Sequence, residues 1–391
     1  MLKLGRQVWP LLVLGLLINT AYSVMWPLTT IYLHNDLQLS LVTSGWILAA
    51  YSGCNVLGGY LGGLLGDRYA VKRVGLALLV ALIADALVGL WWNNVWGYPV
   101  VLIVFGLLTG GMLTLITTLT AQLSRANGRL FNLLYIFINL GLVVGTASIG
   151  VLFHRSLRPI FSLLLVCYGL ATILWERYAD RLTVSGQPVA DPSAEQANRP
   201  TNRRRLGRLT LGVLLISLVL MWGTYAQWMS NVSIYIQNLG LSVSVYSHLW
   251  VYNGLLLILV QGAMARVSRL RSLPWQIIGG LVAISGSFLL LSTAHQIGGL
   301  FAAMTLLTIG EAVYVPGVPA LINAYTIGNE GKYQGLVNAF SSLGKALGPV
   351  AGGWLIGQAA GYSGLLLVCM AVNAGVVVLV ILGSSRFLRR S

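Results

Sequence analysis

Three ionisable side chains interrupt segments that are otherwise apolar: Asp85, Glu311 and Lys345. Charged groups are costly in hydrocarbon, so each of them marks a place for proton or ion chemistry. With a rise of about 1.5 Å per residue, Asp85 lies about 16 Å, Lys345 about 18 Å and Glu311 about 21 Å from the inner end of its segment. All three are therefore expected near the middle of a bilayer, where transporter sites lie.

Glu311 is the first candidate for proton coupling. Hydrocarbon favours the neutral form of a carboxyl group, whereas a nearby cation favours the ionised form. A proton and a cationic ligand, or the ammonium of Lys345, can therefore compete for this one carboxylate. Two alternatives are a fixed Glu311–Lys345 ion pair that only joins two helices, and an anionic headgroup bound by Lys345. Asp85 is a second candidate, or it bonds to a neighbouring helix, or it stays protonated.

The composition indicates that these groups are carried by membrane-spanning helices. The chain has 391 residues, of which 57% are hydrophobic and 8% charged, and its mean hydropathy is +0.81. A soluble domain has about 25% charged residues. At roughly 20 apolar residues per span, the sequence predicts about twelve helices. They cover residues 8–32, 43–65, 74–92, 98–120, 130–153, 159–176, 209–236, 245–265, 275–294, 297–325, 333–360 and 363–384.

The charge distribution predicts an orientation and argues against a nucleic-acid partner. The net charge of +15 comes from Lys and Arg in short loops between apolar spans, most of them on one side. The positive-inside rule then places both termini in the cytoplasm of a multi-pass protein of the inner (plasma) membrane. The three cysteines lie inside apolar spans, and no metal-ligand spacing or nucleotide-binding loop is present. The sequence therefore indicates neither an enzyme nor a metal or cofactor site.

The chain divides into two related halves. Residues 177–208 are polar, with three prolines and the run Arg203-Arg204-Arg205, and predict a cytoplasmic linker between bundles at 1–176 and 209–391. At one constant offset, Gly141 and Gly145 of the fifth span match Gly344 and Gly348 of the eleventh. Such parallel repeats predict a substrate site between the halves, near the midplane. Glycines at four-residue spacing also permit close helix contact.

A loop between the second and third spans resembles a known signature. Gly63, Asp67, Arg68 and Lys72 match the signature loop of the major facilitator superfamily, although Ala70 and Val71 depart from it. The resemblance implies an all-α membrane protein with the major facilitator fold, in which 12 transmembrane helices form two pseudo-symmetric six-helix bundles. It also implies that the matching residues form a conformational latch that breaks and reforms during transport.

The tenth span carries a narrower resemblance. Its segment from Gly310 and Glu311 to Tyr314 and Pro316 looks like one in LmrP-type proton-coupled multidrug exporters, a drug:H+ antiporter branch. In those relatives the matching Glu is implicated in proton and cation handling. They also carry an acidic residue on the fifth span, where this chain has Leu134.

The resemblance further implies a substrate cavity lined by spans one, four, seven and ten. Aromatic and amide side chains on three of these spans suit bulky amphipathic ligands. The candidates are Asn19, Tyr22, Trp26, Trp222, Tyr225, Gln227, Trp228, Asn231 and Tyr314.

These residues together predict a monomeric, proton-coupled exporter of small amphipathic compounds, driven by the proton gradient without a cofactor. Its expected partners are a small-molecule substrate, protons and membrane lipids. The alternatives are a symporter for a nutrient or metabolite, a lipid or glycolipid flippase of the same fold, and a membrane sensor that transports nothing. The charges near the midplane argue against the last of these, because a scaffold does not need them.

Overall fold

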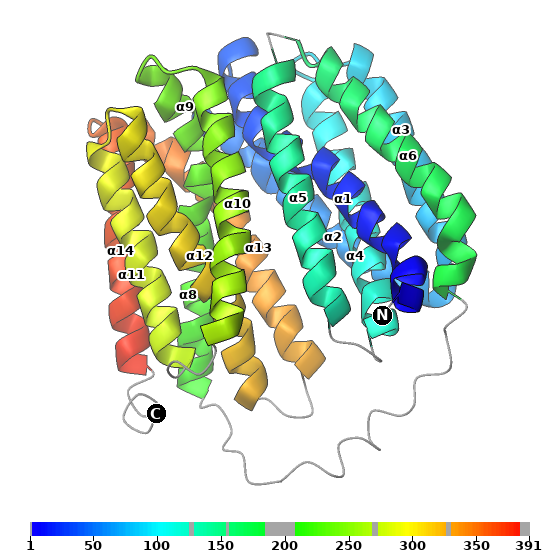
Figure 1. Ribbon diagram of the computed structural model, residues 1–391. Helices are drawn as coiled ribbons and strands as arrows, with labels where there is room; N and C mark the ends of the chain where they lie inside the picture. The colour runs from blue at the N-terminus through cyan, green and yellow to red at the C-terminus, as the bar shows by residue number, and fades with distance from the viewer. Residues whose placement is uncertain are drawn as a thin grey trace. The chain divides into compact units, whose positions relative to one another are not determined.

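Helices make up all the regular secondary structure of the part of the chain that the structure describes (Figure 1). This computed structural model describes residues 2–124, 129–153, 156–183, 208–267, 273–325 and 330–383. The elements are α1 (Leu2–Ile31), a π-helix η1 (Tyr32–Asp36), α2 (Leu41–Arg68), α3 (Val71–Trp91), α4 (Gly97–Ser124), α5 (Arg129–Leu152), α6 (Arg158–Thr183), α8 (Arg208–Met229), α9 (Asn231–Asn238), α10 (Val243–Val267), α11 (Leu273–Thr293), α12 (Ile297–Tyr325), α13 (Glu330–Ile356) and α14 (Gly361–Gly383).

The helices confirm the prediction of an all-α membrane protein. Every segment expected to span the bilayer is helical, and within the described ranges 9 helices are long and apolar enough to cross a membrane by length and composition. The helix is the form expected in hydrocarbon because it satisfies every backbone polar group within the segment. The helices α2, α5 and α13 fall outside those 9, and they carry the glycine-rich and polar stretches of the sequence.

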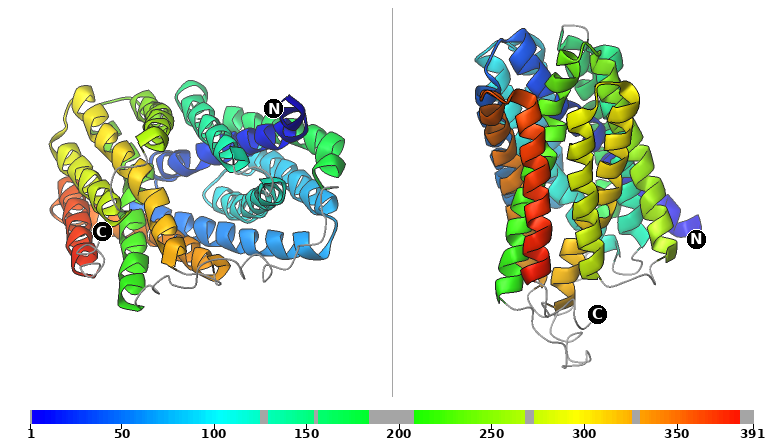
Figure 2. Two further views of the ribbon diagram at one scale, coloured as in Figure 1. Left: turned by 60° about the horizontal axis from the view of Figure 1, so that its bottom comes forward. Right: turned by 90° about the vertical axis from the view of Figure 1, so that its left-hand side faces the viewer.

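Helix packing divides the chain into two compact units. The first comprises Met1–Pro188 and Ile236–Leu255, and the second comprises Val189–Tyr235 and Leu256–Ser391. In the first unit α2 packs on α4, α1 on α5 and α3 on α6. In the second unit α11 packs on α12 and α14, while α13 packs on α8, as the views in Figure 2 also show.

The segment 236–255 packs with the first unit because of contacts with α5. The Ser247 hydroxyl donates to the carbonyl of Thr146 and accepts from the backbone N–H of Gly150 at 3.1 Å. At Gly254, an added Cβ would meet the side chain of Val143. The first half of α10 is thus fixed to α5 by one hydroxyl group and by close packing.

Two departures from the expected helix boundaries stand out. The segment 209–236 is divided between α8 and α9 at Ser230, whose hydroxyl donates to the carbonyl of Ala226 at 2.7 Å. A serine hydroxyl that bonds to the preceding turn competes with the regular backbone pattern. Helix α6 continues to Thr183, past the end of the apolar run, and Asp180 in this added part binds Lys72 of α3. The rest of the expected linker, 184–207, lies outside the described residues.

The matched glycines of the repeat allow close contact between two helices in each unit. An added Cβ on Gly141 of α5 would lie 2.5 Å from the carbonyl oxygen of Leu16 on α1. An added Cβ on Gly344 of α13 would likewise meet the carbonyl oxygen of Val219 on α8. The offset that relates Gly141 to Gly344 also relates Leu16 to Val219. The internal repeat therefore extends from the sequence to the packing of two pairs of helices.

Candidate functional site

The close contact of α8 and α13 brings together two of the candidate residues, Trp222 and Lys345. Gly344 lets the helices approach until its added Cβ would lie 3.0 Å from the Cβ of Trp222. Lys345 is the next residue of α13, so its long side chain starts beside the indole ring. A larger residue at 344 would separate the helices and remove this arrangement.

The ammonium group of Lys345 lies over the face of the Trp222 ring, with Nζ 3.8 Å from the ring centroid. Tyr225, one turn further along α8, meets the same indole edge to face, with centroids 5.0 Å apart and planes at 69°. Tryptophan offers the best aromatic face for a cation, and the attraction is strongest where water is excluded. Trp222 and Lys345 are both half-buried, so the pair is neither walled off in the core nor fully solvated.

Glu311 on α12 acts on this pair through its charge. It interacts electrostatically with the ammonium of Lys345, and its side chain is half-buried. One turn further along α12, the Tyr314 hydroxyl lies 2.8 Å from Oγ of Ser217 on α8. The structure thus brings Trp222, Tyr225, Glu311 and Lys345 into one neighbourhood of the second unit, and Tyr314 ties α12 to α8 beside it.

Three other candidates on α8 and α9 are used in helix packing. Gln227 donates to the carbonyl of Gly348 at 2.7 Å and to that of Gly223 at 3.1 Å. Its own side-chain carbonyl accepts from Asn231 at 2.7 Å. Trp228 is fully buried and packs against Phe288 of α11. These contacts give Gln227, Trp228 and Asn231 a structural role in holding α8, α9, α11 and α13 together.

An apolar cleft of about 280 Å³ is lined by α8, α13 and α14. Its walls include Val219, Leu347, Leu365 and Val368, and its few polar lining residues include Gln227. No charged side chain is among its lining residues. The cleft therefore suits an apolar group, such as an acyl chain or the hydrophobic part of an amphipathic molecule.

The three candidates on α1 lie in the first unit. Asn19 is buried and donates to the carbonyl of Gly15 at 3.0 Å, so this hydrogen bond lies within α1. Tyr22 is half-buried and Trp26 is buried, and both approach the ring of Tyr51 on α2, at centroid distances of 6.4 Å and 5.4 Å.

The aromatic cluster around Tyr51 includes residues that the sequence analysis missed. Phe105 of α4 lies 6.3 Å from Tyr51 between centroids, and Tyr168 of α6 lies 6.4 Å from Phe105. All three rings are less than 2% exposed. Single aromatic residues on three separate spans gave no local pattern. The sequence feature that could have pointed to this cluster is the presence of two tyrosine hydroxyls, those of Tyr51 and Tyr168, inside apolar spans.

Asp85 lies in the first unit, whereas Glu311 and Lys345 belong to the second. Its side chain is 8% exposed, and its Oδ2 atom has no hydrogen-bond partner among the described residues. It interacts electrostatically with Tyr168 of α6. A buried carboxyl oxygen without a partner is a costly feature, so Asp85 is a protonatable group with an incomplete hydrogen-bond environment.

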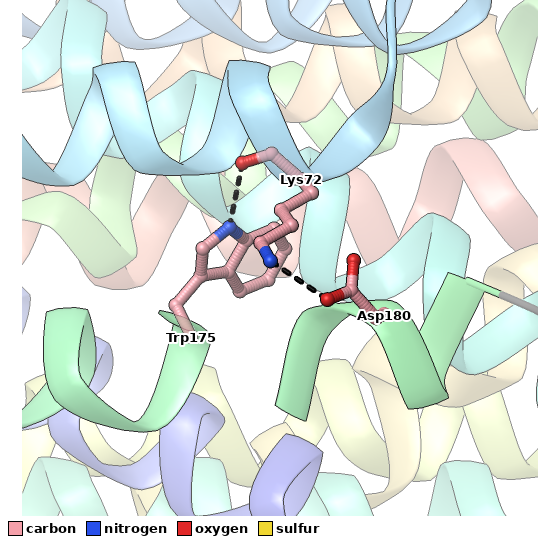
Figure 3. A network of polar contacts seen from close by, with 3 residues as sticks. All are labelled: Lys72, Trp175 and Asp180. Atoms are coloured by element: carbon pink, nitrogen blue, oxygen red, sulfur yellow. Dashed lines mark hydrogen bonds and ion pairs between the residues drawn. The ribbon is translucent and has the colours of Figure 1, made fainter. Parts of the chain in front are cut away.

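The residues of the expected latch lie at the ends of α2 and α3. Gly63 and Arg68 are on α2, Arg68 is exposed, and the side chain of Asp67 lies outside the described residues. Lys72 on α3 forms an ion pair with Asp180 on α6, with Nζ 2.7 Å from Oδ2 (Figure 3).

A tryptophan reinforces this contact between α3 and α6. The indole N–H of Trp175 donates to the backbone carbonyl of Lys72 at 2.9 Å (Figure 3). An added Cβ on Gly75 would collide with the same indole, so the glycine makes room for it. Trp175 and Asp180 were not among the candidates, and Asp180 lies in the segment expected to be linker.

Among the described residues, no three His, Cys, Asp or Glu side chains are grouped closely enough to hold a metal ion.

Comparisons with known proteins agree with the helical architecture. The family model described as Major Facilitator Superfamily matches residues 11–325 and 276–390. An uncharacterized MFS-type transporter of Bacillus subtilis (strain 168), YttB, is 33% identical over 352 residues, which cover 88% of this chain and 87% of that protein.

Two solved structures share the fold at low sequence identity. The POT family transporter PepTSo superposes with a TM-score of 0.80 at 14% identity, covering 99% of both chains. The human organic anion transporter MFSD10 superposes with a TM-score of 0.67 at 17% identity, covering 96% of this chain and 99% of that one.

Proposed function

The chain belongs to the Major Facilitator Superfamily, and from this premise we propose that it is a proton-coupled exporter of small amphipathic compounds, cationic or neutral. Membership makes it a multi-pass membrane transporter of small molecules and not an enzyme. The proposal goes beyond family membership in three respects: export, proton coupling and the chemical class of the substrate. Alternating access is the mechanism proposed for it, since repeated bundles rock about a fixed site in transporters of this kind.

The observation that carries the proposal is the grouping of Lys345, Trp222 and Glu311 in the second unit. An ammonium group is held on an aromatic face at 3.8 Å, and a carboxyl group acts on it electrostatically. These are the groups that bind an organic cation and exchange it for a proton. A helix bundle that served only as a scaffold would not need charges at this depth.

The rest of the proposal follows from the same premise. The proton gradient across the plasma membrane supplies the energy without a cofactor, and both termini face the cytoplasm, as the distribution of Lys and Arg favours. The transporter works as a monomer surrounded by membrane lipid. Glu311 is the coupling residue, and Asp85 is a second protonatable group in the first unit.

Transport into proteoliposomes with an imposed pH gradient tests the function. The comparison is between the wild type and Glu311→Gln, with ethidium as a cationic amphipathic substrate. We expect the variant to lose gradient-driven transport by at least about ten-fold, because an amide cannot exchange a proton. Glu176→Gln, which changes an exposed carboxylate of α6, is the matched control and should transport normally. Normal gradient-driven transport by Glu311→Gln would remove Glu311 from the mechanism.

A second candidate is a lipid or glycolipid transporter, which the apolar cleft favours. A cleft of about 280 Å³ along α8, α13 and α14 would accept an acyl chain. Lys345, which follows the lining residue Gly344 on α13, would bind an anionic headgroup. Transbilayer movement of a fluorescent phosphatidylglycerol in the same proteoliposomes separates the candidates. Lipid movement that depends on Lys345, without ethidium transport, would favour the lipid transporter.

A further inference from the structure

Lys345 occupies the aromatic face that a cationic substrate would need. The ammonium lies 3.8 Å from the centroid of Trp222, and Tyr225 meets the same ring in an edge-to-face contact. A face that accepts an ammonium group at this distance also accepts an organic cation, because the attraction depends on charge and on access to the ring. This one face of the ring cannot hold both ions at once.

We propose that Lys345 is a tethered competitor that alternates between the ring of Trp222 and the carboxylate of Glu311, and that its return to the ring expels an organic monocation. This inference rests on the proposed function, because it specifies how the same site exchanges a proton for a substrate. Both partners of Lys345 are present in the structure, one as a ring contact and one as an electrostatic attraction.

The proton decides which partner Lys345 takes. When Glu311 is ionised, its charge draws the ammonium from the ring, and the exposed face of Trp222 binds the organic cation. When Glu311 takes up a proton, the neutral acid no longer attracts the lysine. The ammonium then returns to the ring and displaces the cation, with no covalent bond changed except that to the proton.

Charge balance makes this exchange favourable in a membrane. With Glu311 ionised and a monocation bound, the site holds two positive charges and one negative charge. With Glu311 protonated and the monocation released, it holds the ammonium alone. The net charge is the same in both states, so the exchange avoids adding a charge to a low-dielectric region, where that cost is high.

Titratable groups lie near Glu311 on its own helix and on neighbouring helices. Tyr314 on its own helix is bonded to Ser217, and Tyr225 on α8 packs against Trp222. Lys345 is the charged group that acts on the carboxyl from α13, and the sequence of α11 contains no titratable side chain. The charge of Glu311 therefore acts on the position of this lysine.

A binding experiment without any gradient separates this inference from the transport proposal. The probe is tetraphenylphosphonium, titrated into the full-length protein in nanodiscs, and triphenylphosphine oxide is the uncharged control. Glu311→Gln mimics the protonated acid and should weaken binding of the cation by about ten-fold, because the lysine then stays on the ring. Lys345→Met should strengthen binding by a similar factor, since the competitor is gone. Neither change should alter binding of the uncharged control more than about two-fold.

The double variant Glu311→Gln with Lys345→Met gives the decisive result. If the lysine is the competitor, removing it restores binding of the cation to Glu311→Gln. If Glu311 binds the cation directly, the double variant binds as weakly as Glu311→Gln or more weakly, and the inference is overturned even when proton-coupled transport is intact. Lys345→Arg should keep the competition, and Trp222→Leu should abolish cation binding in every background. Trp222→Phe, which keeps an aromatic face, should still bind the cation. It is the control for a loss of binding that is caused by misfolding.

Discussion

The hydroxyl group of Tyr314 lies 2.8 Å from Oγ of Ser217, and both side chains are buried. This bond joins the helix that carries Glu311 to the helix that carries Trp222. Since the carboxyl group and the ring lie on different helices, their separation depends on contacts of this kind. The bond therefore positions the two groups between which Lys345 is proposed to move.

Removing one hydroxyl of this pair should destabilise the protein modestly. We expect Tyr314→Phe to lower the free energy of unfolding by about 0.5–1.5 kcal/mol, because Ser217 is left without its partner on α12. Ser217→Ala added to Tyr314→Phe should cost less than the sum of the single changes, since no unpaired hydroxyl remains. Thermal unfolding in detergent measures the loss of stability in the single and double variants. Tyr69→Phe, at an exposed position, is the control. Additive losses would show that the hydroxyls do not interact.

Adding a methyl group at Gly348 should separate α8 from α13. The new Cβ would meet the carbonyl oxygen of Gly223 and lie 3.0 Å from the Cβ of Ala226, so we expect Gly348→Ala to cost about 1–3 kcal/mol. Gly375→Ala on α14 is the matched control, since a Cβ there meets nothing within 4 Å. The control should be neutral or stabilising, because alanine favours a helix more than glycine does. Equal effects of the two changes would contradict the close contact of α8 and α13.

The contact between α3 and α6 should depend on Trp175 more than on the ion pair. Trp175 is fully buried and donates to the carbonyl of Lys72, so Trp175→Ala should cost about 3–5 kcal/mol. Lys72→Met removes a solvated ion pair but keeps that carbonyl, and we expect no measurable change in unfolding temperature. Circular dichroism during heating compares the two variants at low and high salt. A larger loss of stability for Lys72→Met than for Trp175→Ala would show that the ion pair contributes more to this contact than the tryptophan does.

Asp85 should tolerate the loss of its ionisable group. Its Oδ2 atom has no hydrogen-bond partner within the described ranges, and an isolated buried charge is costly. We expect Asp85→Asn to change the free energy of unfolding by less than about 0.5 kcal/mol and to keep gradient-driven transport. The proteoliposome assay checks the second point. Loss of transport with unchanged stability would make Asp85 a second coupling residue beside Glu311.

Sequence alone determined the class of fold, because the information for it is local. A bilayer requires each spanning segment to be apolar along its length and to satisfy its own backbone groups, so the spans can be located one at a time. The same rule singled out Asp85, Glu311 and Lys345 as exceptions that need a reason. The repeat was also visible, since its glycines recur at a constant offset in the sequence.

The partners of those residues were decided by the tertiary structure. Lys345 lies on Trp222 because α8 and α13 meet at Gly344, and a contact between helices depends on register and rotamers that no local pattern specifies. For the same reason the structure showed that Gln227 bonds to Gly348 and that Lys72 pairs with Asp180. Local sequence fixes which segments enter the membrane, whereas the packing of one helix on another decides which side chains meet.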